Sequence, residues 1–148
     1  MHILKGRSHE FFNVTKVYKN LLFLAVFFNS IYFSLPYISP FLYSNEVLSL
    51  MTYTGYSSLF PSEYLNYLAI IYFFSYSATL IGLMFYKKWS EILFFVFVIF
   101  NILLGSAIFG ISVASVLEAG VAYVLSLIEG ALVCLLLFSD ISKKFKRV

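Results

Sequence analysis

The sequence predicts an all-α membrane protein: an antiparallel bundle of four transmembrane helices with a short interfacial helix in the first outer loop. Three observations predict this fold. The composition is 61% hydrophobic and 11% charged, with a mean hydropathy of +0.92, whereas about a quarter of the residues in soluble domains are charged. The ten basic residues occur only near the two ends of the chain and in one turn. Each apolar run between them has room for two helices of the roughly 20 residues that cross a bilayer.

The positions of the basic residues predict the topology, because Lys and Arg are concentrated in cytoplasmic segments of membrane proteins. They form three groups: Lys5, Arg7, Lys16 and Lys19; Lys87 and Lys88; and Lys143, Lys144, Lys146 and Arg147. We therefore expect a single multi-pass membrane domain with cytoplasmic basic tails at residues 1–20 and 139–148. Basic groups that flank apolar runs indicate contacts with anionic lipid headgroups rather than with nucleic acid.

The four spans are expected at about residues 21–37, 64–86, 92–111 and 118–138. We expect Pro40 to end the first helix, because proline lacks the amide donor that a helix interior needs. The residues Ser44, Asn45 and Glu46 resemble a helix start and predict the short interfacial helix. Short links after the second and third spans predict that spans two and three, and spans three and four, pack as antiparallel neighbours.

Four polar residues predict a layer at the midplane of the bilayer, one near the middle of each span: Asn29, Ser75, Asn101 and Glu129. An ionised carboxylate at a helix centre costs about 2.5–3.5 kcal/mol on insertion scales, so these side chains should face inward. No Lys or Arg lies at the depth of Glu129. We therefore expect Glu129 to be protonated at neutral pH and to donate to Asn29, Asn101 or Ser75.

Glu118 precedes Glu129 by eleven residues, which places both on one helix face, about 16 Å apart in height. Two interpretations remain open. The two acids could form a proton path from the outside to the midplane, or Glu118 could cap the start of its helix, where a negative charge is favourable.

A stripe of small side chains runs along the last span, where Ala122, Ser126, Gly130 and Cys134 recur every fourth residue. Small residues let helices approach closely in a bilayer. The stripe therefore predicts a close helix contact, either within the bundle or with a membrane protein partner such as a second copy.

The sequence contains no HExxH, CxxC, phosphate-loop or GxSxG motif. His2 and His9 have no Cys or acidic partner at ligand spacing, and a lone Cys134 cannot form an intramolecular disulfide. We expect no enzyme activity, no metal and no cofactor.

The stretches GYSSLFP at residues 55–61 and LSLIEGA at residues 125–131 resemble small uncharacterised four-span inner-membrane proteins of bacteria. The resemblance implies four spans and a bacterial inner membrane, and it implies no activity. The leading hypothesis is a non-enzymatic protein that binds a partner within the bilayer, such as an immunity protein, a defence-system subunit or an accessory subunit of a membrane complex. The alternative is a small oligomeric proton-linked carrier or channel that uses Glu129.

Overall fold

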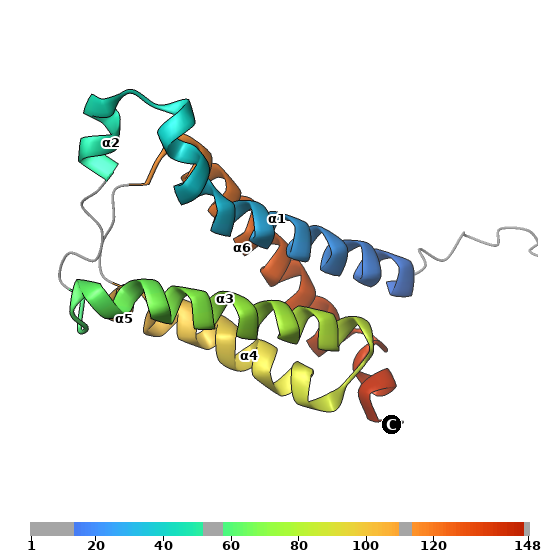
Figure 1. The fold of residues 1–148 in the computed structure, drawn as a ribbon. Coiled ribbons are helices and arrows are strands. Elements are labelled where there is room, and N and C mark those ends of the chain that lie inside the picture. Colours follow the sequence, from blue (N-terminus) through green and yellow to red (C-terminus); the bar gives the residue numbers. More distant parts are fainter. Residues whose placement is uncertain (1–13, 52–57, 110–113, 147–148) are drawn as a thin grey trace, which may run out of the picture.

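The structure, a computed structural model, describes residues 14–51, 58–109 and 114–146. The regular elements in these ranges are all helical (Figure 1), which confirms the predicted all-α class. They are α1 Val14–Leu42, α2 Asn45–Met51, α3 Ser62–Met84, α4 Lys88–Leu103, α5 Gly105–Phe109, α6 Val116–Phe138 and the 3-10 helix η1 Ser142–Lys146. The predictions for His2, His9, Lys5, Arg7 and Arg147 lie outside the described residues.

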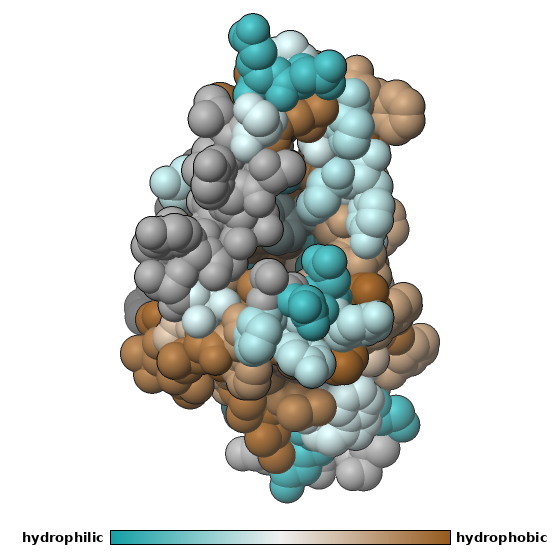
Figure 2. All heavy atoms as spheres, turned by 60° about the vertical axis from the view of Figure 1, so that its left-hand side comes forward, coloured by the Kyte–Doolittle hydropathy of each residue, from teal (hydrophilic) through white to brown (hydrophobic). Residues whose placement is uncertain are grey.

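Within the described ranges, three helices are long and apolar enough to cross a membrane: α1, α3 and α6. With 29, 23 and 23 residues, they are about 43, 34 and 34 Å long, against about 30 Å for the hydrocarbon core of a bilayer. They correspond to the first, second and fourth predicted spans. Hydrophobic side chains cover a broad area of the face in Figure 2, and hydrophilic residues form separate patches.

The third predicted span, residues 92–111, is not one continuous helix. The helix α4 begins earlier, at Lys88, and ends at Leu103 after 16 residues. Leu104, with φ −115° and ψ −19°, separates it from the five-residue helix α5. Gly105 begins α5 and is a poor helix former, about 1 kcal/mol less favourable than Ala in a helix interior. The apolar pattern of the sequence continues across this interruption, so it predicted one continuous helix where the structure has two.

The expectation that Pro40 ends the first helix was wrong, because α1 continues through Pro36 and Pro40 to Leu42. Pro40 has no N–H to donate to the carbonyl of Pro36, one turn earlier. The hydroxyl of Ser39 donates to that carbonyl instead, at 2.9 Å. A side-chain donor thus replaces the missing backbone bond, as happens at prolines in membrane helices.

The helix α1 packs against both α6 and α3, while α3 packs against α4. The α3–α4 hairpin agrees with the pairing expected from the short turn. The helix α6 has its main contact with α1, although α4 was the neighbour expected from loop length. Loop length limits how far apart two consecutive helices lie, but it does not determine which apolar faces bury each other. Buried residues of α1, α3, α4 and α6 form one shared core: Leu22, Ala25, Leu80, Leu83, Phe94, Leu132 and Leu136.

The turn between α3 and α4 is tight because Gly82 lets α4 approach. A Cβ at residue 82 would lie 2.7 Å from the Cβ of Ser90 and 2.9 Å from the ring of Trp89. The amide of Lys87 donates to the carbonyl of Gly82 at 3.0 Å and closes the turn. Tyr86 adopts a positive φ of 54°, a conformation that costs a non-glycine residue roughly 1–2 kcal/mol.

The C-terminal segment packs against the bundle. The side chains of Ile141 and Phe145 are buried in the core cluster. The Phe145 ring meets the Tyr86 ring edge-on at 5.5 Å, and Lys144 donates to the hydroxyl of Thr15 at 2.7 Å. Residues predicted only as part of a basic tail therefore join the start of α1 to the α3–α4 turn.

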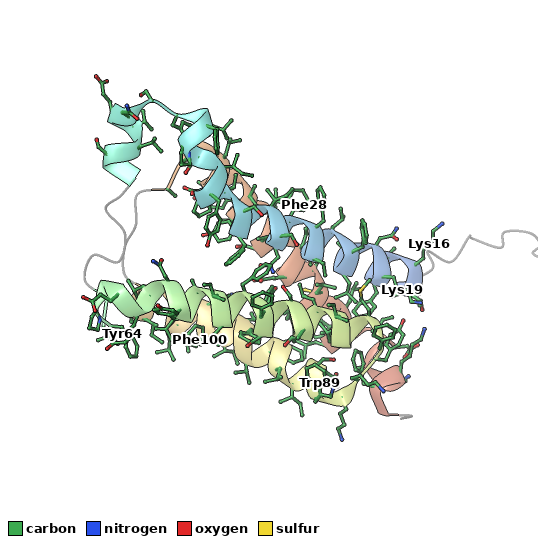
Figure 3. All side chains as sticks on the ribbon, in the orientation of Figure 1. Lys16, Lys19, Phe28, Tyr64, Trp89 and Phe100 are labelled. Atoms are coloured by element: carbon green, nitrogen blue, oxygen red, sulfur yellow. The ribbon has the colours of Figure 1, made fainter. Side chains whose placement is uncertain are left out.

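Apart from Glu129, the described Lys, Asp and Glu residues lie at the two ends of the molecule. The lysines lie where α1 begins, where α3 turns into α4 and in η1, all at one end (Figures 1 and 3): Lys16, Lys19, Lys87, Lys88, Lys143, Lys144 and Lys146. We call this the basic end; it also carries Glu91 and Asp140. Glu46, Glu63 and Glu118 lie in the first turns of α2, α3 and α6, at the opposite end. The remaining described acid, Glu129, lies in the middle of α6.

Candidate functional site: polar contacts of α3

Polar side chains of α1, α4 and α6 pair with residues of α3. The amide of Asn29 donates to the hydroxyl of Ser77 at 3.1 Å. The hydroxyl of Tyr72 donates to Asn101 Oδ1 at 2.8 Å, and the hydroxyl of Tyr76 donates to Glu129 Oε1. The helix α3 thus supplies one polar partner each to α1, α4 and α6.

Three of the four residues predicted for the midplane layer make these contacts, and Ser75 does not. Ser75 lies on the exposed side of α3, where its carbonyl accepts the hydroxyl of Thr79 at 2.8 Å. Ser77 is two residues further along, about 200° around the helix, and it reaches Asn29. In the described structure the polar contacts are separate pairs, and Asn29, Asn101 and Glu129 are not joined directly to one another.

Tyr72 and Tyr76 are functional candidates that the sequence analysis missed. Their rings stack with centroids 5.9 Å apart, and both meet Phe97 edge-on, at 5.3 and 5.5 Å. The signal was available in the sequence, because residues four apart share one helix face and a buried tyrosine hydroxyl usually finds a hydrogen-bond partner.

Glu129 is half-buried on α6 and accepts a hydrogen bond from Tyr76, which is only 2% exposed. The sequence predicted that Glu129 would donate a hydrogen bond to Asn29, Asn101 or Ser75. In the structure Glu129 instead accepts one, from Tyr76. Both an ionised carboxylate and the carbonyl oxygen of a neutral acid can accept this bond. The arrangement therefore holds a carboxyl group in the middle of an apolar helix with a fixed phenol beside it.

Glu118 forms a capping box at the start of α6. The amide of Ser115 donates to Glu118 Oε2 at 2.7 Å, and the amide of Glu118 donates to the Ser115 hydroxyl at 3.1 Å. Each side chain satisfies a backbone donor that the helix start would leave unpaired. This is the capping interpretation of Glu118; a proton path from Glu118 to Glu129 stays a hypothesis.

The predicted small-residue stripe makes no close helix contact within the described chain. Ser126, Gly130 and Cys134 are exposed, and a Cβ placed at Gly130 meets no atom of the described chain within 4 Å. The helix α6 instead packs through larger apolar residues: Leu125, Ile128, Leu132 and Leu136. The hydroxyl of Ser126 is satisfied within α6, where it donates to the carbonyl of Ala122 at 3.0 Å.

Among the described residues, no group of three or more His, Cys, Asp or Glu side chains could hold a metal ion. The fold and these contacts define a small helical protein with three helices that could span a membrane. No protein-family model matches the chain, and comparisons with curated proteins and with solved structures gave no match either.

Proposed function

We propose that this chain is a non-enzymatic, multi-pass protein of a bacterial inner membrane that binds a partner protein within the bilayer. An immunity protein, a defence-system subunit and an accessory subunit of a membrane complex all belong to this class. The supporting observation is the stripe on α6, which the fold leaves uncovered around Gly130. Helices associate in lipid largely through close packing, which small residues permit.

We further propose that both termini are cytoplasmic and that α4 and α5 together make a fourth crossing. From Lys88 to Phe109 the two helices and Leu104 cover 22 residues, about 33 Å if helical throughout. The described lysines lie together at the basic end, as expected for a cytoplasmic surface.

Cross-linking from Cys134 tests partner binding, because this is the only cysteine in the chain and it is exposed beside Gly130. In membranes of the native host, mild oxidation should join two copies if the partner is a second copy, since disulfides need Cα atoms within about 7 Å. A photoreactive group attached to Cys134 should capture a different partner. The absence of both products would refute the proposal.

Two glycines of α6 provide a matched pair of variants. Gly120 and Gly130 are both exposed, and a Cβ at either position meets no described atom within 4 Å. Only Gly130 belongs to the stripe. Gly130→Leu should abolish the cross-linked product and Gly120→Leu should preserve it, and equal yields from the two variants would show that the stripe is not the binding surface.

The alternative is a small oligomeric proton-linked carrier or channel that uses Glu129. Two observations favour it: a carboxyl group in the middle of α6, and the interruption of α4 at Leu104, close to Asn101. Interrupted helices line the substrate and ion sites of many transporters. A proton-flux assay on reconstituted protein tests this function, since Glu129→Gln should then abolish flux while expression and folding are retained.

A further inference from the structure

The α3–α4 turn carries two exposed lysines, Lys87 and Lys88, followed by a half-exposed Trp89. The Trp89 ring lies against Gly82, so closely that a Cβ there would be 2.9 Å from it. The ring is therefore held in place at the end of a candidate span. Tryptophan is enriched at the headgroup level of membranes, where one side of the ring is apolar and the N–H is wet.

Lys19 is brought to the same end by the packing of two tyrosines. The rings of Tyr18 and Tyr86 stack with centroids 5.9 Å apart, and the Tyr18 hydroxyl donates to the carbonyl of Leu83 at 3.3 Å. Each of these tyrosines is followed directly by a lysine, Lys19 on α1 and Lys87 in the turn. The α1 lysines and Trp89 all lie at the basic end in Figure 3.

The lysines of η1 are engaged differently. Lys143 is paired with Asp140 and, by donating a hydrogen bond to it, holds the pKa of that carboxyl below its usual value. Lys144 donates to Thr15 and lies over the Tyr86 ring, 5.4 Å from its centroid. Lys143 and Lys144 therefore lie at the basic end too, but their ammonium groups already have partners within the chain.

We propose that the α3–α4 turn is a binding site for the headgroup of an anionic phospholipid, with Lys87, Lys88 and Lys19 contacting the phosphate and Trp89 lying at the boundary with the acyl chains. The sign of the charge and the position of the turn at the end of α3 both match an anionic leaflet. The site is distinct from the α6 stripe and depends only on the turn lying at the bilayer surface.

Trp89 is the only tryptophan in the chain, so its fluorescence reports on the lipid at this turn. The full-length protein would be reconstituted in mixtures of phosphatidylglycerol and phosphatidylcholine, with one of the two lipids brominated so that it quenches a neighbouring tryptophan. Brominated phosphatidylglycerol should quench Trp89 more strongly at equal mole fraction. The association constant for phosphatidylglycerol should exceed that for phosphatidylcholine, and each lysine that contacts the lipid should multiply the ratio of the two constants by about five.

Variants at the basic end separate this site from a general attraction of positive charge. Lys88→Gln should lower the ratio by about fivefold, and Lys87→Gln with Lys88→Gln should lower it further, toward one. Lys143→Gln removes the same charge from the same end, and because Lys143 is already paired it should change the ratio less than twofold. An unchanged emission maximum in pure phosphatidylcholine shows that each variant is folded.

Equal quenching of the wild-type protein by the two brominated lipids would overturn the proposal. An effect of Lys143→Gln as large as that of Lys88→Gln would also overturn it, since the preference would then follow the total charge of the basic end.

Discussion

The contact between Tyr76 and Glu129 gives the sharpest prediction on stability. Tyr76→Phe removes only the hydroxyl and keeps the ring, which packs against Tyr72 and Phe97. Leaving a buried acceptor without its donor costs about 1–3 kcal/mol, but hydrogen bonds between membrane helices average about 0.6 and reach about 1.7 kcal/mol. Tyr76 is almost fully buried, so we expect a loss near the upper end of the membrane range, about 1–1.5 kcal/mol.

Tyr72→Phe is the matched control for this change. It removes the same atom from the same face of α3, but Tyr72 is less buried than Tyr76, and its acceptor is the neutral amide of Asn101 rather than a carboxyl group. We therefore expect a loss of at most about 0.5 kcal/mol. Reversible unfolding in mixed detergent and SDS micelles, followed by circular dichroism, measures both free energies.

A double-mutant cycle isolates the contact itself. Glu129→Leu leaves the Tyr76 hydroxyl without its acceptor, whereas the double variant with Tyr76→Phe removes both polar groups. The double variant should be more stable than the sum of the single losses predicts, by about 1 kcal/mol or more. Additive losses, or equal losses for Tyr76→Phe and Tyr72→Phe, would refute the reasoning.

Three further predictions follow from other parts of the molecule. Phe145→Ala, at a fully buried position, should lower the free energy of unfolding by about 3 kcal/mol in the same assay. Its control, Phe138→Ala, at an 85% exposed position, should lower it by less than about 0.5 kcal/mol. Similar losses for the two variants would mean that η1 is not part of the core. Glu129→Gln keeps an acceptor for Tyr76 and should preserve the fold and partner binding, so a folded but inactive protein would favour the carrier hypothesis. Reporter fusions after Asn45 should report the outside and fusions after Lys87 the cytoplasm, and the reverse result would contradict the topology.

The parts of the fold that depend on long stretches of sequence were predicted well. The long apolar helices α1, α3 and α6 follow from hydropathy. One local feature was also predicted: the start of α2 at Asn45 follows from the residue types that favour a helix start. The end of α1 could not be predicted, because it depends on whether the Ser39 hydroxyl reaches the carbonyl of Pro36. The position of this one hydroxyl group decides whether α1 continues past Pro40.

The polar contacts needed information that the sequence does not contain. Depth along a helix can be counted, but the rotation of α3 about its axis, which turns Ser77 inward and Ser75 outward, depends on how all its neighbours pack. The burial of Phe145 was hidden for another reason. It is one aromatic residue among four basic ones at the C-terminus, and the charges dominate any average over that segment.

The pairing of α1 with α6 has a consequence for how the protein is made. The start of α6 is 74 residues beyond the end of α1, so at a synthesis rate of about 5–20 residues per second the ribosome needs about 4–15 s to reach it. During that interval α1 is already complete, but the helix against which it packs most extensively does not yet exist. Asn29 can be paired earlier, when Ser77 is synthesised with α3. The helix α1 therefore completes its burial only after α6 has been synthesised, and assembly of the bundle waits for that helix.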